Sequence, residues 1–169
     1  MKNTELLHWM LDDVRKETLK GVSHLSAEQL FQSPVEGEAP IGSFLMHLGE
    51  VDAWWYSVIS GKEMSDEIKK AVYFDCWYDS KEAKPPTTPL EPEIYADAIT
   101  KTRNIVLDYI NTLKDEQLEE KVVMKWSGGE KELTRKWIIY HLIEHEAHHR
   151  GQMFMLIRKA GWKKKNKNK

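Results

Sequence analysis

Four of the seven histidines lie within nine residues near the C-terminal end of the chain: His141, His145, His148 and His149. Because successive residues of an α-helix are rotated by about 100°, His141, His145 and His149 share one helix face. Imidazole is polar, so a buried row of such rings needs polar partners and is an unusual way to build a core. Two histidines one turn apart can instead bind one metal ion at about 2.0–2.1 Å. The spacing predicts a metal site, and a purely structural row of histidines is the alternative.

The same segment, His145-Glu146-Ala-His-His149, satisfies the His-Glu-x-x-His pattern of zinc proteases, in which the glutamate is the general base. Those enzymes take a third ligand from further along the chain. Residues 150–169, however, contain no His, Asp or Glu. A small helical chain also offers little of the strand and cleft that hold a peptide substrate. The protease interpretation is therefore disfavoured. A third ligand has to come from upstream, where His47 is the best candidate.

Several acidic neighbours of the histidines are candidates for supporting roles. His47-Leu-x-Glu50 is echoed by His141-Leu-x-Glu144, and either glutamate is placed to accept a hydrogen bond that fixes the tautomer of a histidine ligand. Glu146 is a candidate for the same role or for a general base. The alternative for all three glutamates is an exposed position on the surface of a helix bundle.

The remaining reactive side chains give weaker signals. Arg150, directly after the histidine cluster, is a candidate anion contact, and a surface ion pair is the alternative. Cys76 has no basic or histidine neighbour in the sequence, which is typical of an inert thiol. As the single cysteine of the chain, it excludes an internal disulfide and fits a reducing cytoplasm.

The candidate residues are expected to lie on helices, because apolar residues recur every three or four positions through most of the chain. The periodicity predicts four long amphipathic helices, over residues 4–22, 41–60, 92–113 and 133–160. Pro92 suits the first turn of the third helix, and Gly61 and Gly161 suit the C-terminal caps of the second and fourth. The predicted fold is all-α: a four-helix bundle with His47 on the second helix and the histidine cluster on the fourth.

Two connections between these helices are distinctive. Residues 62–91 form a long crossover, with a short helix expected over 66–73, and such a crossover allows the second and third helices to run parallel. Residues 121–133 contain two short extended pieces around a Gly-Gly turn, which predicts a small β-hairpin before the fourth helix. The aromatic residues of the crossover are expected to anchor it on the bundle: Tyr73, Phe74, Trp77 and Tyr78.

Length and charge indicate one domain. The 169 residues, 41% hydrophobic and 31% charged, suit a single globular domain over residues 1–162. Residues 163–169 carry five lysines and no acid, which predicts a basic, disordered tail. The whole chain has a net charge of −2, so without these five positive charges residues 1–162 stand at −7, which argues against a nucleic-acid partner. The sequence shows no bilayer-spanning apolar run and no signal peptide, so we expect no membrane association and a cytoplasmic location.

Three motifs lie on the predicted helices: Leu45-Met-His47-Leu-x-Glu50 in the second, then Trp137-x-x-Tyr-His141-Leu and His145-Glu-Ala-His-His149-Arg-Gly-Gln152 in the fourth. With the helix order, the crossover and the hairpin, they resemble the DinB-like family over most of residues 1–160. This family includes YfiT-type metal-dependent enzymes and bacillithiol S-transferases.

The resemblance implies a bundle in which the second helix donates one histidine, and the last helix two, to a divalent metal ion, zinc or nickel. Carried over residue by residue, the implied ligands are His47, His145 and His149. His141 and His148 are additional to this set, so ligation by His47, His141 and His145 stays open as an alternative. Family members are commonly homodimers, which implies a homodimer here.

Three neutral imidazoles leave the full +2 charge on a metal ion and at least one coordination position open, as in catalytic rather than structural sites. Such an ion lowers the pKa of bound water towards about 7 and deprotonates a bound thiol. We therefore expect a metal-dependent enzyme, either an S-transferase that joins a small-molecule thiol to an electrophile or a hydrolase. The resemblance favours the thiol, whereas the residues alone do not choose. A non-catalytic metal-binding bundle protein of the stress response is the alternative.

Overall fold

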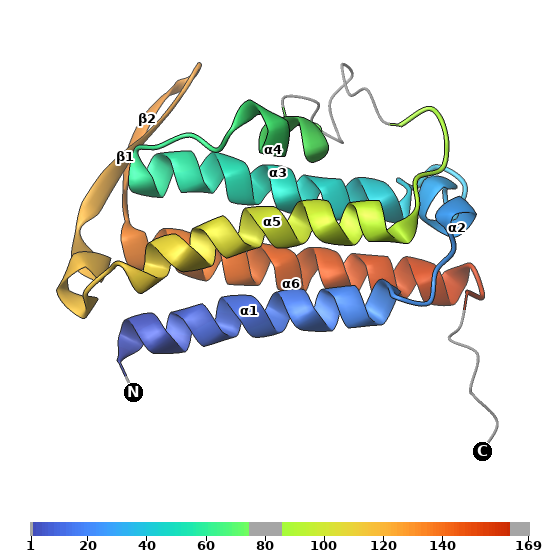
Figure 1. Ribbon diagram of the computed structural model, residues 1–169, viewed down its shortest axis with the longest axis horizontal. Coiled ribbons are helices and arrows are strands. Elements are labelled where there is room, and N and C mark those ends of the chain that lie inside the picture. The colour runs from blue at the N-terminus through green and yellow to red at the C-terminus, as the bar shows by residue number, and fades with distance from the viewer. Residues whose placement is uncertain (1, 75–85, 163–169) are drawn as a thin grey trace.

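The computed structural model describes residues 2–74 and 86–162, and its core is a bundle of four long helices (Figure 1). These helices are α1 (Asn3–Val22), α3 (Ile41–Ser60), α5 (Pro92–Asn111) and α6 (Arg135–Lys159). Each turns a stripe of apolar side chains inward, as the helical periodicity of the sequence requires. The predicted four-helix bundle is confirmed, and the second long helix has the predicted bounds.

The helices follow an unusual up-down-down-up order. Figure 1 shows α1 and α6 running in one direction and α3 and α5 in the other. The neighbours α3 and α5 are therefore parallel. A parallel pair needs a connection as long as the bundle, since the 20 residues of α3 alone span about 30 Å. The segment after α3, which contains α4 (Asp66–Ala71), provides this length, and the predicted long crossover is confirmed.

A two-stranded antiparallel hairpin precedes α6, as predicted. Its strands are β1 (Lys121–Trp126) and β2 (Gly129–Thr134). Leu133 pairs within the hairpin and is buried against the bundle, so this residue belongs to the strand. The predicted start of the last helix at residue 133 is therefore wrong by two residues. Thr134 ends the strand and caps α6, its Oγ1 accepting a hydrogen bond from the Trp137 N–H at 3.3 Å.

Smaller elements lie at the ends of the bundle. The short helix α2 (Ala27–Phe31) connects α1 to α3, and the 3-10 helix η1 (Asp115–Glu119) connects α5 to the hairpin. Both α5 and α4 end two residues before their predicted ends, at Asn111 and Ala71. Apolar periodicity locates the body of a helix, but the last turn depends on local hydrogen bonds that the periodicity does not report.

The crossover packs against α3. Val72 is buried, and Gly49 allows its close approach, because a Cβ at Gly49 would lie 2.5 Å from a methyl group of Val72. Tyr73 and Phe74 also pack against the core, as expected of anchoring aromatic residues. Three further side chains of this segment lie outside the described part of the chain: Cys76, Trp77 and Tyr78.

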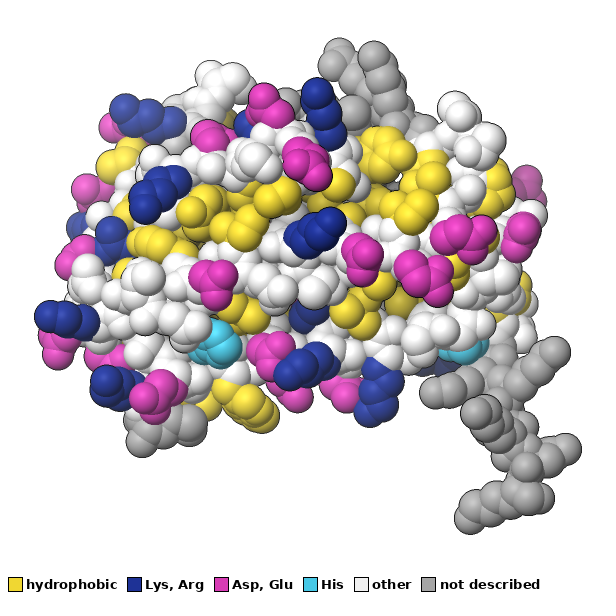
Figure 2. Space-filling view, viewed as in Figure 1, with side chains coloured by type: hydrophobic (Ala, Val, Ile, Leu, Met, Phe, Trp, Pro, Cys, Tyr) yellow, Lys and Arg dark blue, Asp and Glu magenta, His cyan; other side chains and the backbone are white. Residues whose placement is uncertain are grey.

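The surface mixes charges of both signs. Figure 2 shows lysine, arginine, aspartate and glutamate side chains interspersed over one face of the molecule. Among the described helices, none combines the length and the apolarity that crossing a bilayer requires. The lysine-rich tail, residues 163–169, lies outside the described residues. Its disorder, the cytoplasmic location and the homodimer stay predictions.

Candidate metal centre

Three histidines from two facing helices come together where α3 meets α6. His47 lies on α3 and is buried, and His145 and His149 lie one turn apart on α6. The ring centroid of His47 is 5.2 Å from that of His145 and 5.1 Å from that of His149, and the two α6 rings are 4.4 Å apart. Each ring offers one nitrogen, and these three nitrogens all lie within 4.8 Å of one another. We call this group the histidine cluster.

The spacing of the two α6 histidines fits a shared metal ion. The Nε2 atoms of His145 and His149 are 3.2 Å apart. Two nitrogens bound to one ion at about 2.05 Å are separated by about 3.3 Å at a tetrahedral angle and by about 2.9 Å at a right angle. Imidazole nitrogens also suit first-row divalent ions such as zinc and nickel. The residues present therefore fit such an ion.

The protonation state of His145 is the one that binds metals. Burial, together with the neighbouring imidazoles of His149 and His47, lowers the pKa of His145 to about 3. The ring is therefore neutral at pH 7 and keeps a lone pair for a metal ion. Metal binding to this nitrogen does not have to displace a proton.

Gln152 orients one of the ligand rings. Its Oε1 lies 2.7 Å from His149 Nδ1, so the ring donates a hydrogen bond from Nδ1 and keeps the lone pair of Nε2 on the side facing His145. Gln152 belongs to one of the histidine motifs, but the sequence did not lead us to predict a role for it. Its position three residues after His149, on the same side of the helix, is the signal that could have revealed this contact.

The two His-Leu-x-Glu motifs have the same local geometry. Glu50 Oε2 lies 3.5 Å from His47 Nδ1, and Glu144 Oε2 lies 3.6 Å from His141 Nδ1. Their surroundings differ, because Glu50 is buried whereas Glu144 is exposed. Glu50 Oε1 has no hydrogen-bond partner among the described residues. Glu50 is therefore placed to hold His47, and Glu144 takes the exposed position given as its alternative.

His141 lies beside the histidine cluster but is not one of its members. Its ring is 5.6 Å from that of His145, and it stacks on Trp137 at 5.1 Å with an angle of 6° between the ring planes. Trp55 of α3 packs against the same imidazole at 5.2 Å. Within the described part of the chain, the group of nitrogens close enough to share an ion contains His149 and not His141. The geometry thus favours the set that the resemblance implied.

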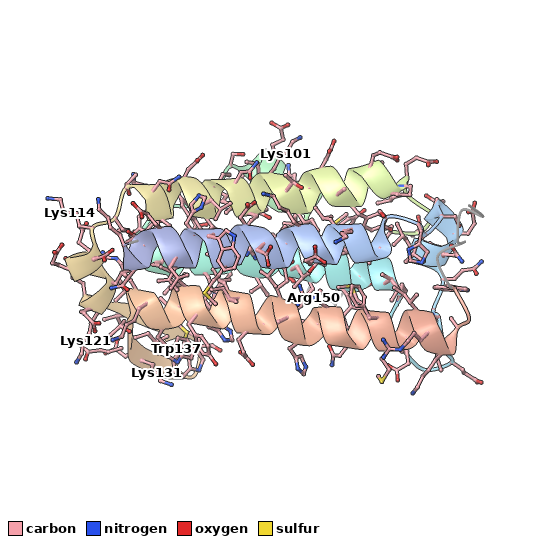
Figure 3. All side chains as sticks on the ribbon, turned by 90° about the horizontal axis from the view of Figure 1, so that it is seen from below. Lys101, Lys114, Lys121, Lys131, Trp137 and Arg150 are labelled. Carbon is pink, nitrogen blue, oxygen red and sulfur yellow. The ribbon has the colours of Figure 1, made fainter. Side chains whose placement is uncertain are left out.

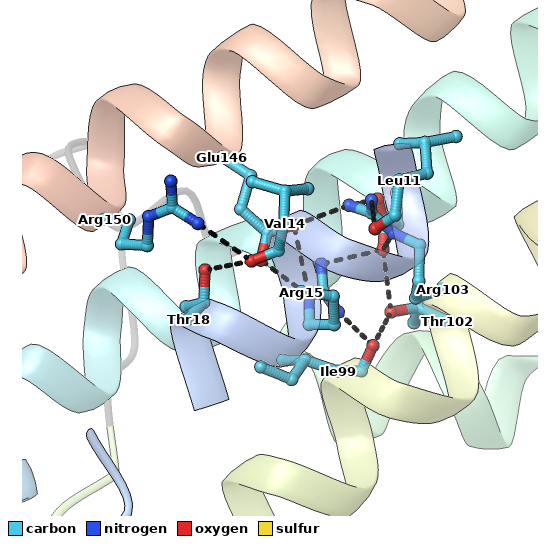
Figure 4. A network of polar contacts seen from close by, with 10 residues as sticks. Leu11, Val14, Arg15, Thr18, Ile99, Thr102, Arg103, Glu146 and Arg150 are labelled. Carbon is cyan, nitrogen blue, oxygen red and sulfur yellow. Dashed lines mark hydrogen bonds and ion pairs between the residues drawn. The ribbon is translucent and has the colours of Figure 1, made fainter. Parts of the chain in front are cut away.

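Two further candidate residues on α6 lie outside the histidine cluster. His148 is exposed, although its ring is 5.4 Å from that of His149. Arg150 donates a hydrogen bond from Nη1 to the carbonyl oxygen of Val14 on α1, at 3.3 Å (Figure 4). No acidic partner of Arg150 is present among the residues described, so this arginine joins α6 to α1 instead of forming the suggested ion pair.

Glu146 is turned into the bundle and does not reach the surface. Its two oxygens accept hydrogen bonds from Arg15 Nε at 2.9 Å and from Arg103 Nη2 at 2.8 Å (Figure 4). Burial alone would raise the pKa of Glu146, but the charges of Arg15 and Arg103 outweigh it and lower the pKa to about 2. The exposed alternative is therefore wrong for Glu146. Both of its oxygens accept hydrogen bonds from arginines inside the bundle, which is not the arrangement suggested for a general base or a histidine partner.

Three residues that were not predicted from the sequence complete this buried ion-pair network of Arg15, Asp52, Arg103 and Glu146. Asp52 on α3 accepts a hydrogen bond from Arg15 Nη2 at 3.1 Å. It also accepts two from Arg103, at 3.0 and 2.8 Å. All four residues are at most 3% exposed. Each occupies a position within the apolar stripe of its helix, and this is the signal that could have revealed them.

A surface groove of about 470 Å³ lies at the hairpin end of the bundle. Figure 3 shows Trp137 and Lys131 together at this end of α6, and Lys131 Nζ lies 5.7 Å from the centre of the Trp137 ring. The volume is in the range of pockets that bind small organic molecules. The apolar lining of the groove comes from α1, η1 and α6: Leu6, Leu7, Leu118, Trp137 and Tyr140.

The metal-free protein is expected to lose stability as the pH falls from about 6.5 to about 3, in part through His145. In this window the unfolded chain protonates His145 at its ordinary pKa, whereas the folded chain does not, so protons favour unfolding. At pH values above this window, the stability that the folded protein gains from the lowered pKa of His145 is fully present. Melting temperatures measured with a chelator between pH 7 and pH 4 should fall less for His145→Gln than for the wild type. An equal decline in both proteins would contradict the lowered pKa.

Comparison with known proteins shows which family the chain belongs to. A sequence profile of the DinB superfamily matches residues 10–153. The uncharacterised protein YizA of Bacillus subtilis is 28% identical over 145 residues, which cover 86% of this chain and 80% of YizA. The sequence match therefore spans nearly the whole described bundle.

Solved structures share the fold. A conserved protein from Enterococcus faecalis superposes with a TM-score of 0.74 at 17% identity, covering 96% of this chain and 99% of that protein. YfiT from Bacillus subtilis, described as a probable metal-dependent hydrolase with an unusual four-helix bundle topology, superposes with a TM-score of 0.66 at 15% identity, covering 95% and 89%. With the profile match over most of its length, the chain belongs to the DinB superfamily.

Proposed function

We propose that this chain is a metal-dependent enzyme in which His47, His145 and His149 hold a divalent metal ion, zinc or nickel, that activates a small nucleophile. The observation that carries the proposal is the histidine cluster, whose three nitrogens lie within 4.8 Å of one another. The 3.2 Å spacing of two of these nitrogens supports it. When bound, such an ion lowers the pKa of a coordinated water molecule towards about 7 and deprotonates a coordinated thiol.

The chain prepares the site by orienting its rings and by packing one of them against the apolar core. Gln152 holds the tautomer of His149, and Glu50 stands beside His47. Phe44, a buried residue of the apolar core, lies with its ring 5.7 Å from that of His149. Fixed ligands and apolar surroundings strengthen electrostatic interactions at the site and limit the approach of bulk water.

Two nucleophiles are compatible with this site, and each has support. Water is supported by YfiT, which shares the fold and is described as a probable metal-dependent hydrolase. A small-molecule thiol that attacks an electrophile is supported by the resemblance of the histidine motifs to bacillithiol S-transferases. In both reactions the three neutral imidazoles contribute no negative charge, so the positive charge of the ion acts on the nucleophile.

Elemental analysis and activity assays on the full chain, without a histidine tag, test the proposal. We expect about one ion per chain. We also expect activity that a chelator abolishes and that zinc or nickel restores, measured in parallel on chromogenic esters and on mixtures of small thiols with electrophiles. Bound metal without turnover in either assay would indicate a non-catalytic metal-binding protein. A chain that takes up neither zinc nor nickel would overturn the proposal.

A further inference from the structure

The buried ion-pair network joins the same two helices that carry the histidine cluster. Asp52 lies on α3, five residues after His47, and Glu146 lies on α6, directly after His145. Both carboxylates are completely buried. The network therefore ends on the two helices whose relative position decides whether one metal ion can reach all three histidines.

Each arginine of the network bridges both carboxylates. Arg103 Nη2 donates hydrogen bonds to Asp52 Oδ1 and to Glu146 Oε2, both at 2.8 Å. Arg15 donates from Nε to Glu146 Oε1 at 2.9 Å and from Nη2 to Asp52 Oδ2 at 3.1 Å. Helices α3 and α6 are thus connected twice, through planar guanidinium groups whose donors have fixed directions.

Each of the two arginines also donates a hydrogen bond to the backbone of the helix that carries the other arginine. Arg15 of α1 donates from Nη1 to the carbonyl oxygen of Ile99 on α5. Arg103 of α5 donates from Nη1 to the carbonyl oxygen of Leu11 on α1, at 3.1 Å (Figure 4). All four long helices therefore contribute to one set of directed contacts in the middle of the bundle.

Stability alone explains such a network poorly. The cost of removing charges from water offsets much of their attraction, and replacing a complete buried network by apolar side chains of similar volume is often neutral or stabilising. Apolar packing, however, tolerates small rotations and shifts of one helix against another. A metal site does not, because its ligand distances must be correct to within about 0.2 Å. Directed hydrogen bonds between α3 and α6 supply the accuracy that apolar packing lacks.

We propose that the buried ion-pair network positions α6 against α3 and thereby sets the separation of His47 from His145 and His149. Its four members are positioning residues, which act through the histidines. This inference rests on the proposed metal centre, and it adds the contacts that bring the three metal-binding histidines together.

A fourfold apolar variant tests this role, because it removes the network without leaving an unpaired charge: Arg15→Met, Asp52→Leu, Arg103→Met and Glu146→Leu. Circular dichroism and thermal unfolding are expected to show a folded bundle. Its affinity for Co²⁺, followed by visible absorption, is expected to fall by about 10- to 100-fold, with altered absorption bands of the bound ion. A folded variant with wild-type affinity and wild-type bands overturns the inference.

A second pair of variants separates positioning from general destabilisation and also serves if the fourfold variant does not fold. Arg103→Lys keeps the charge, but a single ammonium group lacks the planar fork that reaches both carboxylates. Ile110→Ala is the matched control, because Ile110 is completely buried on the same helix and its truncation opens a cavity without removing a network residue. We expect weaker Co²⁺ binding only for Arg103→Lys. Equal Co²⁺ affinities in the two variants overturn the inference.

The wild-type titration distinguishes this inference from the proposed function. A wild-type chain that binds no Co²⁺, Zn²⁺ or Ni²⁺ overturns the metal centre and, with it, the positioning role. A wild-type chain that binds these ions as tightly as the network variants do overturns the positioning role alone.

Discussion

Replacing His47, His145 or His149 by alanine is expected to abolish stoichiometric metal binding while the bundle stays folded. The three nitrogens converge within 4.8 Å, so each substitution leaves two ligands for an ion that needs at least three from the protein. Loss of a partner that only supports a ligand already costs about 10- to 100-fold in metal affinity, so loss of a ligand should cost more than about 100-fold. Elemental analysis after dialysis, together with Zn²⁺ titration, measures the effect.

Two other histidines of α6 provide matched controls. His148 is exposed, so His148→Ala should keep the wild-type metal content. His141→Ala should also keep it, because the His141 nitrogens are not part of the histidine cluster. Loss of metal in His141→Ala, with metal retained in His149→Ala, would restore the alternative ligand set of His47, His141 and His145. Retention of metal in all the single variants would contradict the site itself.

The arrangement of the bundle could be predicted from the sequence because its determinants are local. Apolar periodicity and a C-terminal glycine place the second long helix over Ile41–Ser60, as observed. The length of the crossover indicates a parallel pair of helices, and the Gly-Gly turn indicates the hairpin. The error at Leu133 also has a local cause, since an apolar residue at this junction suits either the inner face of a strand or the first turn of a helix.

The histidine cluster was predictable for a different reason. Histidines at a four-residue spacing must share a helix face, whatever the rest of the fold does. The choice between His141 and His149 was not predictable from spacing, because both lie one turn from His145. It depends on how α6 is placed along α3, which sets His47 beside His145 and His149 at nearly equal ring distances of 5.2 and 5.1 Å.

The interpretation of Glu146 went wrong because neighbours in sequence are not neighbours on a helix. Residue 146 is rotated by about 100° from His145, which takes its side chain from the α3 interface into the centre of the bundle. Its partners Arg15 and Arg103 stand 131 and 43 residues away in the chain. A charged residue in an apolar stripe signals that a buried partner exists, but the sequence alone does not say which helix provides it.

Removing Arg103 alone is expected to destabilise the metal-free protein more than any of the histidine substitutions does. Arg103→Ala takes one of two cations from two carboxylates that are completely buried, and breaking a buried pair in this way costs about 3–5 kcal/mol. This is a large fraction of the roughly 5–15 kcal/mol that stabilises a typical domain. Urea unfolding of the metal-free variant and wild type at pH 7 measures the difference, and a loss below about 1 kcal/mol would contradict the ion-pair geometry.

The stability lost in Arg103→Ala is expected to depend on pH in a definite direction. In the wild type the pKa of Glu146 is lowered to about 2 from an ordinary value of 4.5, so its contribution is present above pH 4.5 and is lost as the pH falls towards 2. With one cation fewer, burial raises the pKa of Glu146 again. Acid therefore removes less stability from the variant than from the wild type. The stability difference between wild type and Arg103→Ala should therefore be smaller at pH 3 than at pH 7. The control is Lys101→Ala, because Lys101 is exposed on the same helix and points away from the bundle (Figure 3), so its loss should change stability by less than about 0.5 kcal/mol at either pH.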